Sequence, residues 1–177
     1  MNVNLNGQFE AAAEPEAVYD FITDPDKFAP ILPYFKGLTK TSETEFTVTL
    51  EVGVPQIRGK SDVQTKRIGA ERPKFVKYQL SGRHALGIMD AKMTFEIEPL
   101  GVGSRVDWTV EAIVSGKLAS LAQGILIPLA NRQIKSLAQA AQDALGGPPG
   151  GAAAVQPGLV ARGAASFKDF FGGKTAK

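Results

Sequence analysis

The segment GKLASLAQGILIPLANRQIKSLAQAAQDAL, residues Gly116 to Leu145, contains the one long helical pattern of the sequence. At about 100° per residue, its first half places one apolar set on a single face: Leu118, Leu121, Ala122, Ile125 and Leu129. After Pro128 the apolar face lies about 150° away on the same wheel and comprises Ala130, Ile134, Leu137, Ala138, Ala141 and Leu145. Pro128 lacks an amide hydrogen and its ring crowds the carbonyl of Gly124, which predicts a bend there. Either the helix bends so that both faces meet one sheet, or its first half is apolar on two sides and binds another molecule.

The segments before this helix alternate between apolar and polar residues, as strands do in a half-buried sheet. Residues 2–12 form the first such run, and Pro15 and Asp24-Pro25 then mark the starts of two short helices, the second ending near Ile31. Further alternating runs follow at residues 46–54, 57–64, 76–81, 92–97 and 105–112. Their short connections favour an antiparallel meander. The order predicts an α+β fold in which a curved antiparallel sheet wraps around the long C-terminal helix.

The inward-facing positions of these strands combine large and very small residues. Glycines at Gly7, Gly59, Gly82 and Gly87 interrupt the apolar faces, and glycine within a strand often marks a bulge or the close approach of another group. A strongly curved sheet over a single helix tends to leave a cavity. A filled core with bulges fits the same pattern equally well.

Composition excludes several classes of chemistry. The 177 residues suit one domain with a sizeable core, and the sequence has no cysteine and a single histidine, His84. Disulfides, cysteine metal sites and multi-histidine metal sites are therefore excluded. The N-terminus shows no secretory signal, and the longest apolar run, Ile125–Ala130, is far shorter than the roughly 20 residues that span a bilayer. We expect a cytoplasmic protein, peripheral at most to the inner face of the cell membrane.

The charge is distributed unevenly. Residues 1–145 carry 16 basic and 17 acidic residues, which argues against nucleic-acid binding, whereas residues 146–177 carry four basic residues and one acidic residue. Residues 146–154 have the composition of a flexible linker. Residues 155–177 follow as a tail, and a helix there would gather docking residues for a membrane or a partner: Val160, Arg162, Phe167, Lys168, Phe170 and Phe171. Gly158 and Gly163 favour a disordered tail instead.

Several strings are similar to one family. They are FEAAAEPEAVYDFITDP (9–25), VGVPQIRGKSDV (52–63), GVGSRVDWTVEAIVSGKLASLAQGIL (101–126) and NRQIKSL (131–137). Over residues 1–145 the chain resembles the helix-grip superfamily of START, Bet v 1-like and polyketide-cyclase-like (SRPBCC) domains, and within it the carbon monoxide dehydrogenase CoxG family. One departure is the loop Ile31-Leu32-Pro33-Tyr34, which is bulkier than the loop common in that family.

The resemblance implies an apolar ligand cavity between the sheet and the last helix. It also implies an accessory role beside a molybdenum-containing carbon monoxide dehydrogenase at the membrane. Relatives in the superfamily bind ubiquinone, and such a dehydrogenase needs an electron acceptor. A carrier of an isoprenoid quinone, menaquinone or ubiquinone, is therefore the sharpest hypothesis, and a membrane-recruitment adaptor with an incidental cavity is an alternative.

We expect the following inward apolar residues to contact the ligand: Phe28, Ile31, Leu32, Phe35, Leu50, Val52, Tyr78, Leu80, Met89, Met93, Trp108, Val110, Leu118, Leu121, Ala122 and Ile125. Tyr78 and Trp108 have polar tips that could reach a quinone carbonyl, although core packing with an internal partner explains them as well. Gly124, Leu126 and Pro128 are the expected gate, with Leu126 and Ile127 facing outward near the entrance.

No catalytic or metal-binding set emerges from the sequence. A general acid or base must lie within reach of a substrate, yet the strand carboxylates fall on the outward phase: Glu51, Glu96, Asp107 and Glu111. His84 lies near a strand junction, where a lone histidine is more often a surface or turn residue than a ligand contact. We therefore expect a protein that is not an enzyme, and a small-molecule cyclase or hydrolase of the same superfamily is the remaining alternative.

Overall fold

The structure, a computed structural model, describes residues 1–149. Its seven strands form one antiparallel sheet in the order β1-β7-β6-β5-β4-β3-β2. The strands are β1 (Asn2–Ala11), β2 (Phe35–Lys40), β3 (Glu45–Val52), β4 (Gly59–Glu71), β5 (Phe75–His84), β6 (Gly87–Leu100) and β7 (Gly103–Val114). The helical elements are α1 (Pro15–Thr23), α2 (Pro25–Phe28), η1 (Ala29–Ile31), η2 (Pro55–Ile57), α3 (Lys117–Leu121), η3 (Ala122–Leu126) and α4 (Ile127–Ala144). This architecture confirms the predicted α+β helix-grip fold.

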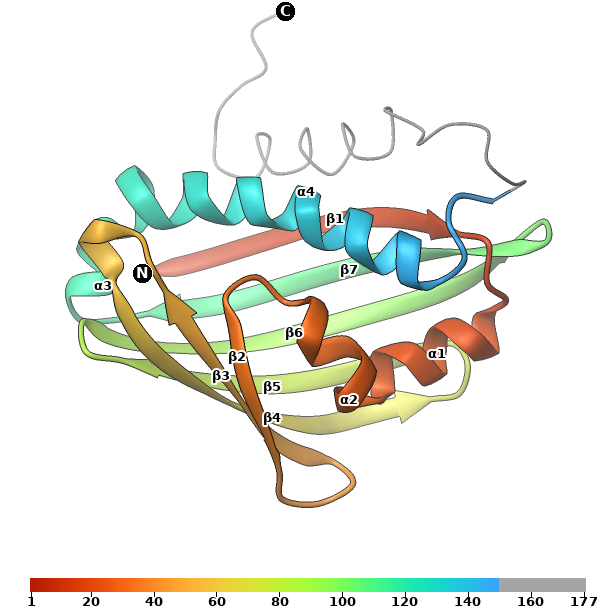
Figure 1. The fold of residues 1–177 in the computed structure, drawn as a ribbon, viewed down its shortest axis with the longest axis horizontal. Helices are drawn as coiled ribbons and strands as arrows, with labels where there is room; N and C mark the ends of the chain where they lie inside the picture. The colour runs from red at the N-terminus through yellow and green to blue at the C-terminus, as the bar shows by residue number, and fades with distance from the viewer. Residues whose placement is uncertain (150–177) are drawn as a thin grey trace, which may run out of the picture.

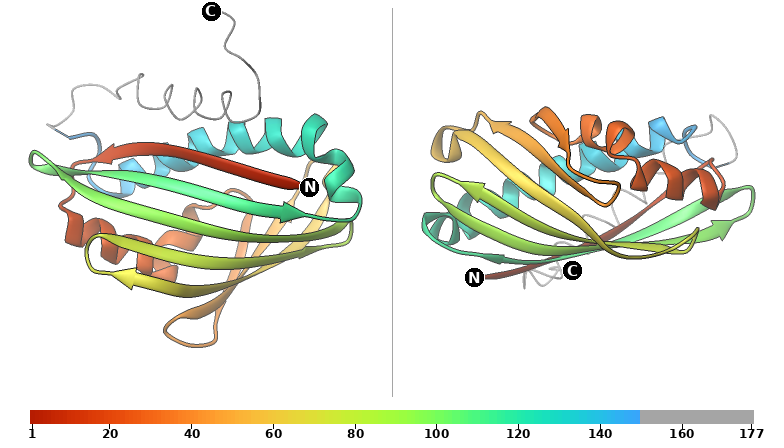
Figure 2. Two further views of the ribbon diagram at one scale, coloured as in Figure 1. Left: turned by 180° about the vertical axis from the view of Figure 1, so that it is seen from behind. Right: turned by 90° about the horizontal axis from the view of Figure 1, so that it is seen from below.

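The sheet curves, and the helices lie on its concave face (Figures 1 and 2). Helix α4 runs along the sheet and contacts β1 and η1, while α1 and α2 lie over the part of the sheet that α4 leaves open. Helix α3 lies at the opposite end of the domain from α1 (Figure 1). The domain therefore has one sheet layer and one helix layer, with the apolar interior between them.

The buried apolar side chains form two separate clusters toward opposite ends of the sheet. The α1 cluster contains Phe9, Ala11, Val18, Tyr19, Phe21, Ile22, Val76, Tyr78, Phe95, Ile97, Val106, Trp108, Ala141 and Leu145. The α3 cluster has three buried members, Ile57, Val114 and Leu118, and is completed by side chains that are only partly buried: Val3, Val52, Val54, Leu86, Met89, Ala119, Leu121, Ile125, Leu126 and Leu129. The α1 end is thus closely packed and the α3 end is not.

The last helix is interrupted where the sequence predicts it. Residues Ala122–Leu126 form one turn of π-helix, in which the amide of Ile127 bonds to the carbonyl of Ala122. This turn separates the two apolar faces, so that Leu121 and Ile125 pack into the α3 cluster, whereas Ile134 packs against the α1 cluster. Single π turns are a known cause of changes in helix direction and occur often at functional sites. The predicted disruption near Gly124 is therefore confirmed.

The predicted orientation of Leu126 is wrong. Leu126 is partly buried and packs into the α3 cluster rather than facing outward, because the extra residue of the π turn rotates it toward the interior. Gly124 and Pro128 are exposed, and a side chain at Gly124 would meet nothing within 4 Å. The role of these residues as a gate stays a prediction.

Strand β2 was not predicted from the sequence. It follows two prolines, contains Gly37 at a bulge opposite β3, and has too short an alternating run to stand out. It lies at the edge of the sheet, where Lys36 and Lys40 face solvent and discourage pairing with another chain. Strand β4 is longer than the predicted run at residues 57–64, because it continues through a bulge at Gly69 to Glu71.

The first two residues of the predicted linker, Gly146 and Gly147, lie just beyond the end of α4. Gly146 and Gly147 adopt φ values of 89° and 84°, and the Gly147 amide bonds to the carbonyl of Gln142, which ends α4 as a glycine cap. The Gly147 carbonyl then accepts a hydrogen bond of 2.9 Å from the amide of Ala12. Both glycines are therefore part of the folded domain. Most of the predicted linker and the whole predicted docking tail, from Val155 to Lys177, lie outside the described residues.

We predict that Gly7→Ala destabilises the domain. Gly7 lies opposite Trp108 on β7, and a Cβ atom at Gly7 would fall 2.5 Å from Cζ2 of the indole. Displacing this buried ring should lower the free energy of unfolding by about 1–3 kcal/mol, measured by urea unfolding monitored through the fluorescence of Trp108. Gly37→Ala is the matched control, since its Cβ would meet nothing within 4 Å. Equal stability of the two variants would contradict the prediction.

Candidate functional site

A row of short side chains crosses the inner face of the sheet between the two clusters. Ala91 on β6 pairs with Ala112 on β7, and the row continues through the longer Leu80 of β5 to Thr65 of β4. In the next row, Gly82 is opposite Met89. Short side chains reach less far from a sheet than the aromatic residues of the α1 cluster do, so the sheet contributes little volume here. This row is where an apolar guest would meet the least resistance.

Large apolar side chains at the β2–β3 side of the interior are only half-buried. Leu50 is paired with Phe35 across β3 and β2, and Leu32 precedes them in the loop that leaves η1. Leu32, Phe35, Leu50 and Leu80 belong to neither cluster, although each lies partly covered. Ligand pockets are lined mainly by apolar side chains, so these four residues are candidates for such a lining.

The structure divides the predicted ligand contacts into three groups. Six of them belong to or pack on the α1 cluster: Phe28, Ile31, Tyr78, Met93, Trp108 and Val110. Five belong to or pack on the α3 cluster: Val52, Met89, Leu118, Leu121 and Ile125. The remaining five are Leu32, Phe35, Leu50, Leu80 and the fully buried Ala122. The second and third groups flank the row of short side chains and form the candidate site, whereas the first group is mainly core.

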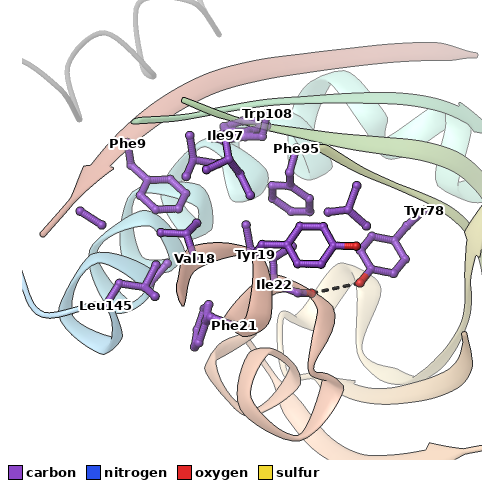
Figure 3. Close-up of a cluster of buried hydrophobic side chains, with 14 residues drawn as sticks. Phe9, Val18, Tyr19, Phe21, Ile22, Tyr78, Phe95, Ile97, Trp108 and Leu145 are labelled. Atoms are coloured by element: carbon purple, nitrogen blue, oxygen red, sulfur yellow. Dashed lines mark hydrogen bonds between the residues drawn. The ribbon is translucent and has the colours of Figure 1, made fainter. Parts of the chain in front are cut away.

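Tyr78 already has an internal partner. Its hydroxyl donates a hydrogen bond of 3.0 Å to the carbonyl of Ile22 near the end of α1 (Figure 3). Only 5% of the residue is exposed, and burial raises the pKa of Tyr78 to about 12. Trp108 is also buried, against Gly7. Tyr78 and Trp108 therefore pack in the core, which is one of the two roles that the sequence suggests for them.

A second hydrogen bond ties α4 to the loop before β2. Gln133 donates from Nε2 to the hydroxyl of Tyr34 at 3.2 Å, and the Tyr34 carbonyl accepts from the amide of Glu51. The backbone of Tyr34 has a φ of 64°, a value that residues other than glycine rarely adopt. A strained residue thus joins the last helix to the sheet edge beside Leu32 and Phe35. In the sequence, the dipeptide Pro33-Tyr34 is the one feature that hints at this contact.

Two buried polar atoms have no hydrogen-bond partner among residues 1–149. One is Nε2 of His84, at the end of β5, and the other is Oδ1 of Asn131 on α4. Asn131 lies about one helical turn before Ile134, which packs against the α1 cluster, so Asn131 points toward the interior. Unpartnered buried polar atoms are rare in folded proteins, and each calls for an explanation.

The charged groups lie elsewhere. Glu51, Glu96 and Glu111 are exposed and Asp107 is half-buried, which agrees with the predicted outward phase. Two open hollows on the outer face are lined mainly by outward-facing residues such as Gln79, Lys92 and Glu111. Within the described chain no group of three or more histidine, cysteine or acidic residues could hold a metal ion. None of the described helices is long and apolar enough to cross a membrane.

Comparison with known proteins agrees with this geometry. The family model of the carbon monoxide dehydrogenase protein CoxG matches residues 7–146. A search of curated proteins gives no match. A conserved protein from Geobacillus kaustophilus is 23% identical with a TM-score of 0.74, covering 81% of this chain and 95% of that one. A START superfamily protein from Mycobacterium smegmatis is 15% identical with a TM-score of 0.62, covering 80% and 96%. At these identities the solved structures establish the fold alone.

We predict that Tyr78→Phe changes the response of stability to alkaline pH. Because the folded protein holds the phenol proton more tightly than the unfolded chain, the stability that Tyr78 contributes is complete below about pH 10 and is lost as pH rises towards 12. The free energy of unfolding of the wild type should fall more steeply over this range than that of the variant. The difference should reach on the order of 2 kcal/mol, measured by urea unfolding at each pH. Parallel curves would show that folding does not raise the pKa of Tyr78, and would contradict the prediction.

Proposed function

Because the chain belongs to the carbon monoxide dehydrogenase CoxG family, we propose that it is a non-enzymatic carrier of a hydrophobic ligand that serves a molybdenum-containing carbon monoxide dehydrogenase. The ligand that we favour is an isoprenoid quinone, menaquinone or ubiquinone. A quinone would accept the electrons that the dehydrogenase releases. Its long apolar tail can leave the membrane only if a protein shields it from water.

One observation carries this proposal: the interior is closely packed at the α1 end and only half-buried at the α3 end. Leu121 and Ile125 from the last helix, and Val52 and Met89 from the sheet, are all partly exposed. The row of short side chains containing Ala91 and Ala112 separates this end from the α1 cluster. An apolar guest of suitable shape would cover these surfaces and gain about 25 cal/mol for each Å² removed from water.

The arrangement of charge supports a binding role over a catalytic one. Among residues 1–149, the polar residues that are buried as a whole are Thr65, Ser104 and Gln142, and none of them carries an acidic or basic group. His84 is partly exposed, and only its Nε2 atom is buried without a partner. Ser104 and Gln142 bond to backbone carbonyls, of Ala13 at 2.7 Å and of Glu10 at 2.7 Å. They therefore hold the fold together rather than face a substrate.

We further propose that the protein works at the inner face of the cytoplasmic membrane. The basis is the sequence of residues 155–177, in which three phenylalanines, Phe167, Phe170 and Phe171, accompany Arg162 and Lys168. Apolar side chains flanked by basic ones favour reversible attachment to an anionic lipid surface. Such attachment would hold the domain close to the source of its ligand.

The direct test is to recover the ligand. Protein purified from its native membrane environment, or incubated with vesicles that contain menaquinone, should carry one quinone per chain in native mass spectrometry and yield it on organic extraction. Repeated recovery of protein without quinone, together with no uptake from vesicles, would refute the proposal.

We predict that Leu121→Trp abolishes ligand uptake. Leu121 is partly buried in the α3 cluster, so the larger indole should occupy the space that the ligand needs and weaken quinone binding more than tenfold. Ser120→Trp is the matched control, because Ser120 is exposed at the neighbouring position. Binding is measured by transfer of quinone from vesicles, and thermal unfolding confirms that both variants fold.

The same variant separates the carrier from the membrane-recruitment adaptor. If the protein is a carrier, Leu121→Trp should also stop electron transfer from the dehydrogenase to membrane quinone. If it is an adaptor, Leu121→Trp should leave electron transfer intact, whereas deletion of residues 155–177 should abolish it.

A further inference from the structure

The side chain of His84 lies on the interior side of the sheet at the junction of three elements. His84 ends β5 opposite Gly87 of β6, and it shares the inward phase of Tyr78 and Gly82. Its Nε2 lies 3.2 Å from the position that a Cβ atom of Gly59 would occupy, so the glycine leaves room for the imidazole. His84 is therefore an inward residue, not the surface or turn residue that its sequence position favours.

Hydrogen bonds connect this histidine to the start of the last helix. The amide of Leu86 donates to Nδ1 of His84 at 3.1 Å, and the carbonyl of Leu86 accepts from the amide of Leu118 in α3 at 3.0 Å. A hydrogen bond accepted at Nδ1 leaves the proton of a neutral imidazole on Nε2. The orientation of the ring and the position of its proton are thus both determined by the backbone of the β5–β6 turn.

The resulting Nε2–H donor is buried and has no acceptor among the described residues. A buried donor without a partner is destabilising, since it has lost its water and gained nothing in exchange. Several of its neighbours are apolar: Gly59 pairs with Val52, Leu86 follows in the turn, and both Val52 and Leu86 pack into the α3 cluster. The half-buried end of the interior therefore contains one oriented donor in apolar surroundings.

We infer that Nε2–H of His84 donates a hydrogen bond to a carbonyl oxygen of the bound ligand. The inference rests on the proposed carrier function and adds the orientation of the guest. The polar head group lies at the α3 end, beside His84 and Gly59, and the apolar tail extends over the row of Ala91 and Ala112. A ligand that is apolar except for a carbonyl acceptor satisfies the donor, whereas a plain hydrocarbon or a cationic head group does not.

The test uses His84→Asn in the full-length chain with menaquinone in vesicles as the probe. An asparagine oxygen can accept from the amide two residues later, so the bond to Leu86 is preserved while the donor at the position of Nε2 is lost. Loss of one neutral hydrogen bond should weaken menaquinone binding roughly 2- to 12-fold. In the wild type, the infrared stretch of one ¹³C-labelled ring carbonyl should lie below its value in alkane, and this shift should vanish in the variant.

Thermal unfolding of the ligand-free proteins is the control, and His84→Leu is a second variant that removes both ring nitrogens. Equal affinity and an equal carbonyl stretch in wild type and His84→Asn would overturn the inference while leaving the carrier function intact. Failure of the wild type to bind either menaquinone or ubiquinone would instead refute the carrier function. Weaker binding with an unshifted carbonyl in the wild type would also overturn the inference, because His84 would then act through packing alone.

Discussion

A single helix is too narrow to cover the inner face of a seven-stranded sheet, and this mismatch governs the rest of the domain. Neighbouring strands lie about 4.8 Å apart, so seven strands span about 29 Å, whereas a helix with its side chains is about 10–12 Å wide. The sheet is curved, and α1 and α2 cover the part of its inner face that α4 leaves open (Figure 2). The three helices together seal the α1 end, where Phe9, Trp108 and Phe95 are buried. The α3 end has no equivalent cover and is sealed by partly exposed side chains.

The interruption in the last helix follows from the same division. A continuous α-helix presents one apolar stripe, but the two clusters require stripes that point in different directions. The π turn at Ala122–Leu126 inserts the extra residue that rotates one stripe relative to the other. Leu118 and Leu121 can then pack at one end of the sheet while Ile134 and Ala138 pack at the other. Pro128 lies in the first turn of α4, where its missing amide hydrogen costs least.

Polar groups are treated differently at the two ends of the interior. In the α1 cluster the hydroxyl of Tyr78 reaches the carbonyl of Ile22, so burial leaves no donor without an acceptor there (Figure 3). At the α3 end, Nε2 of His84 is buried without an acceptor among residues 1–149, although Nδ1 of the same ring is bonded to Leu86. An unsatisfied donor costs about 1–3 kcal/mol. One end of the interior is closely packed, and the other contains an unsatisfied donor. This distribution is expected of a domain that binds a ligand at one end.

Local chemistry was enough to predict much of this structure. Side chains alternate along any strand, so the outward phase of Glu51 and Glu96 followed from residue order alone. The cap at Asp24, which accepts from the amide of Asp26 at 3.0 Å, needed only its neighbours, and so did the break near Pro128. Contacts between residues that lie far apart in the sequence could not be predicted from local chemistry. Gly7 leaves room for Trp108, Ile22 accepts from Tyr78, and His84 faces Gly59, and each depends on strand register and curvature. Strand β2 and the division of the apolar residues into two clusters were also decided in three dimensions, because they arise from which surfaces one narrow helix can cover.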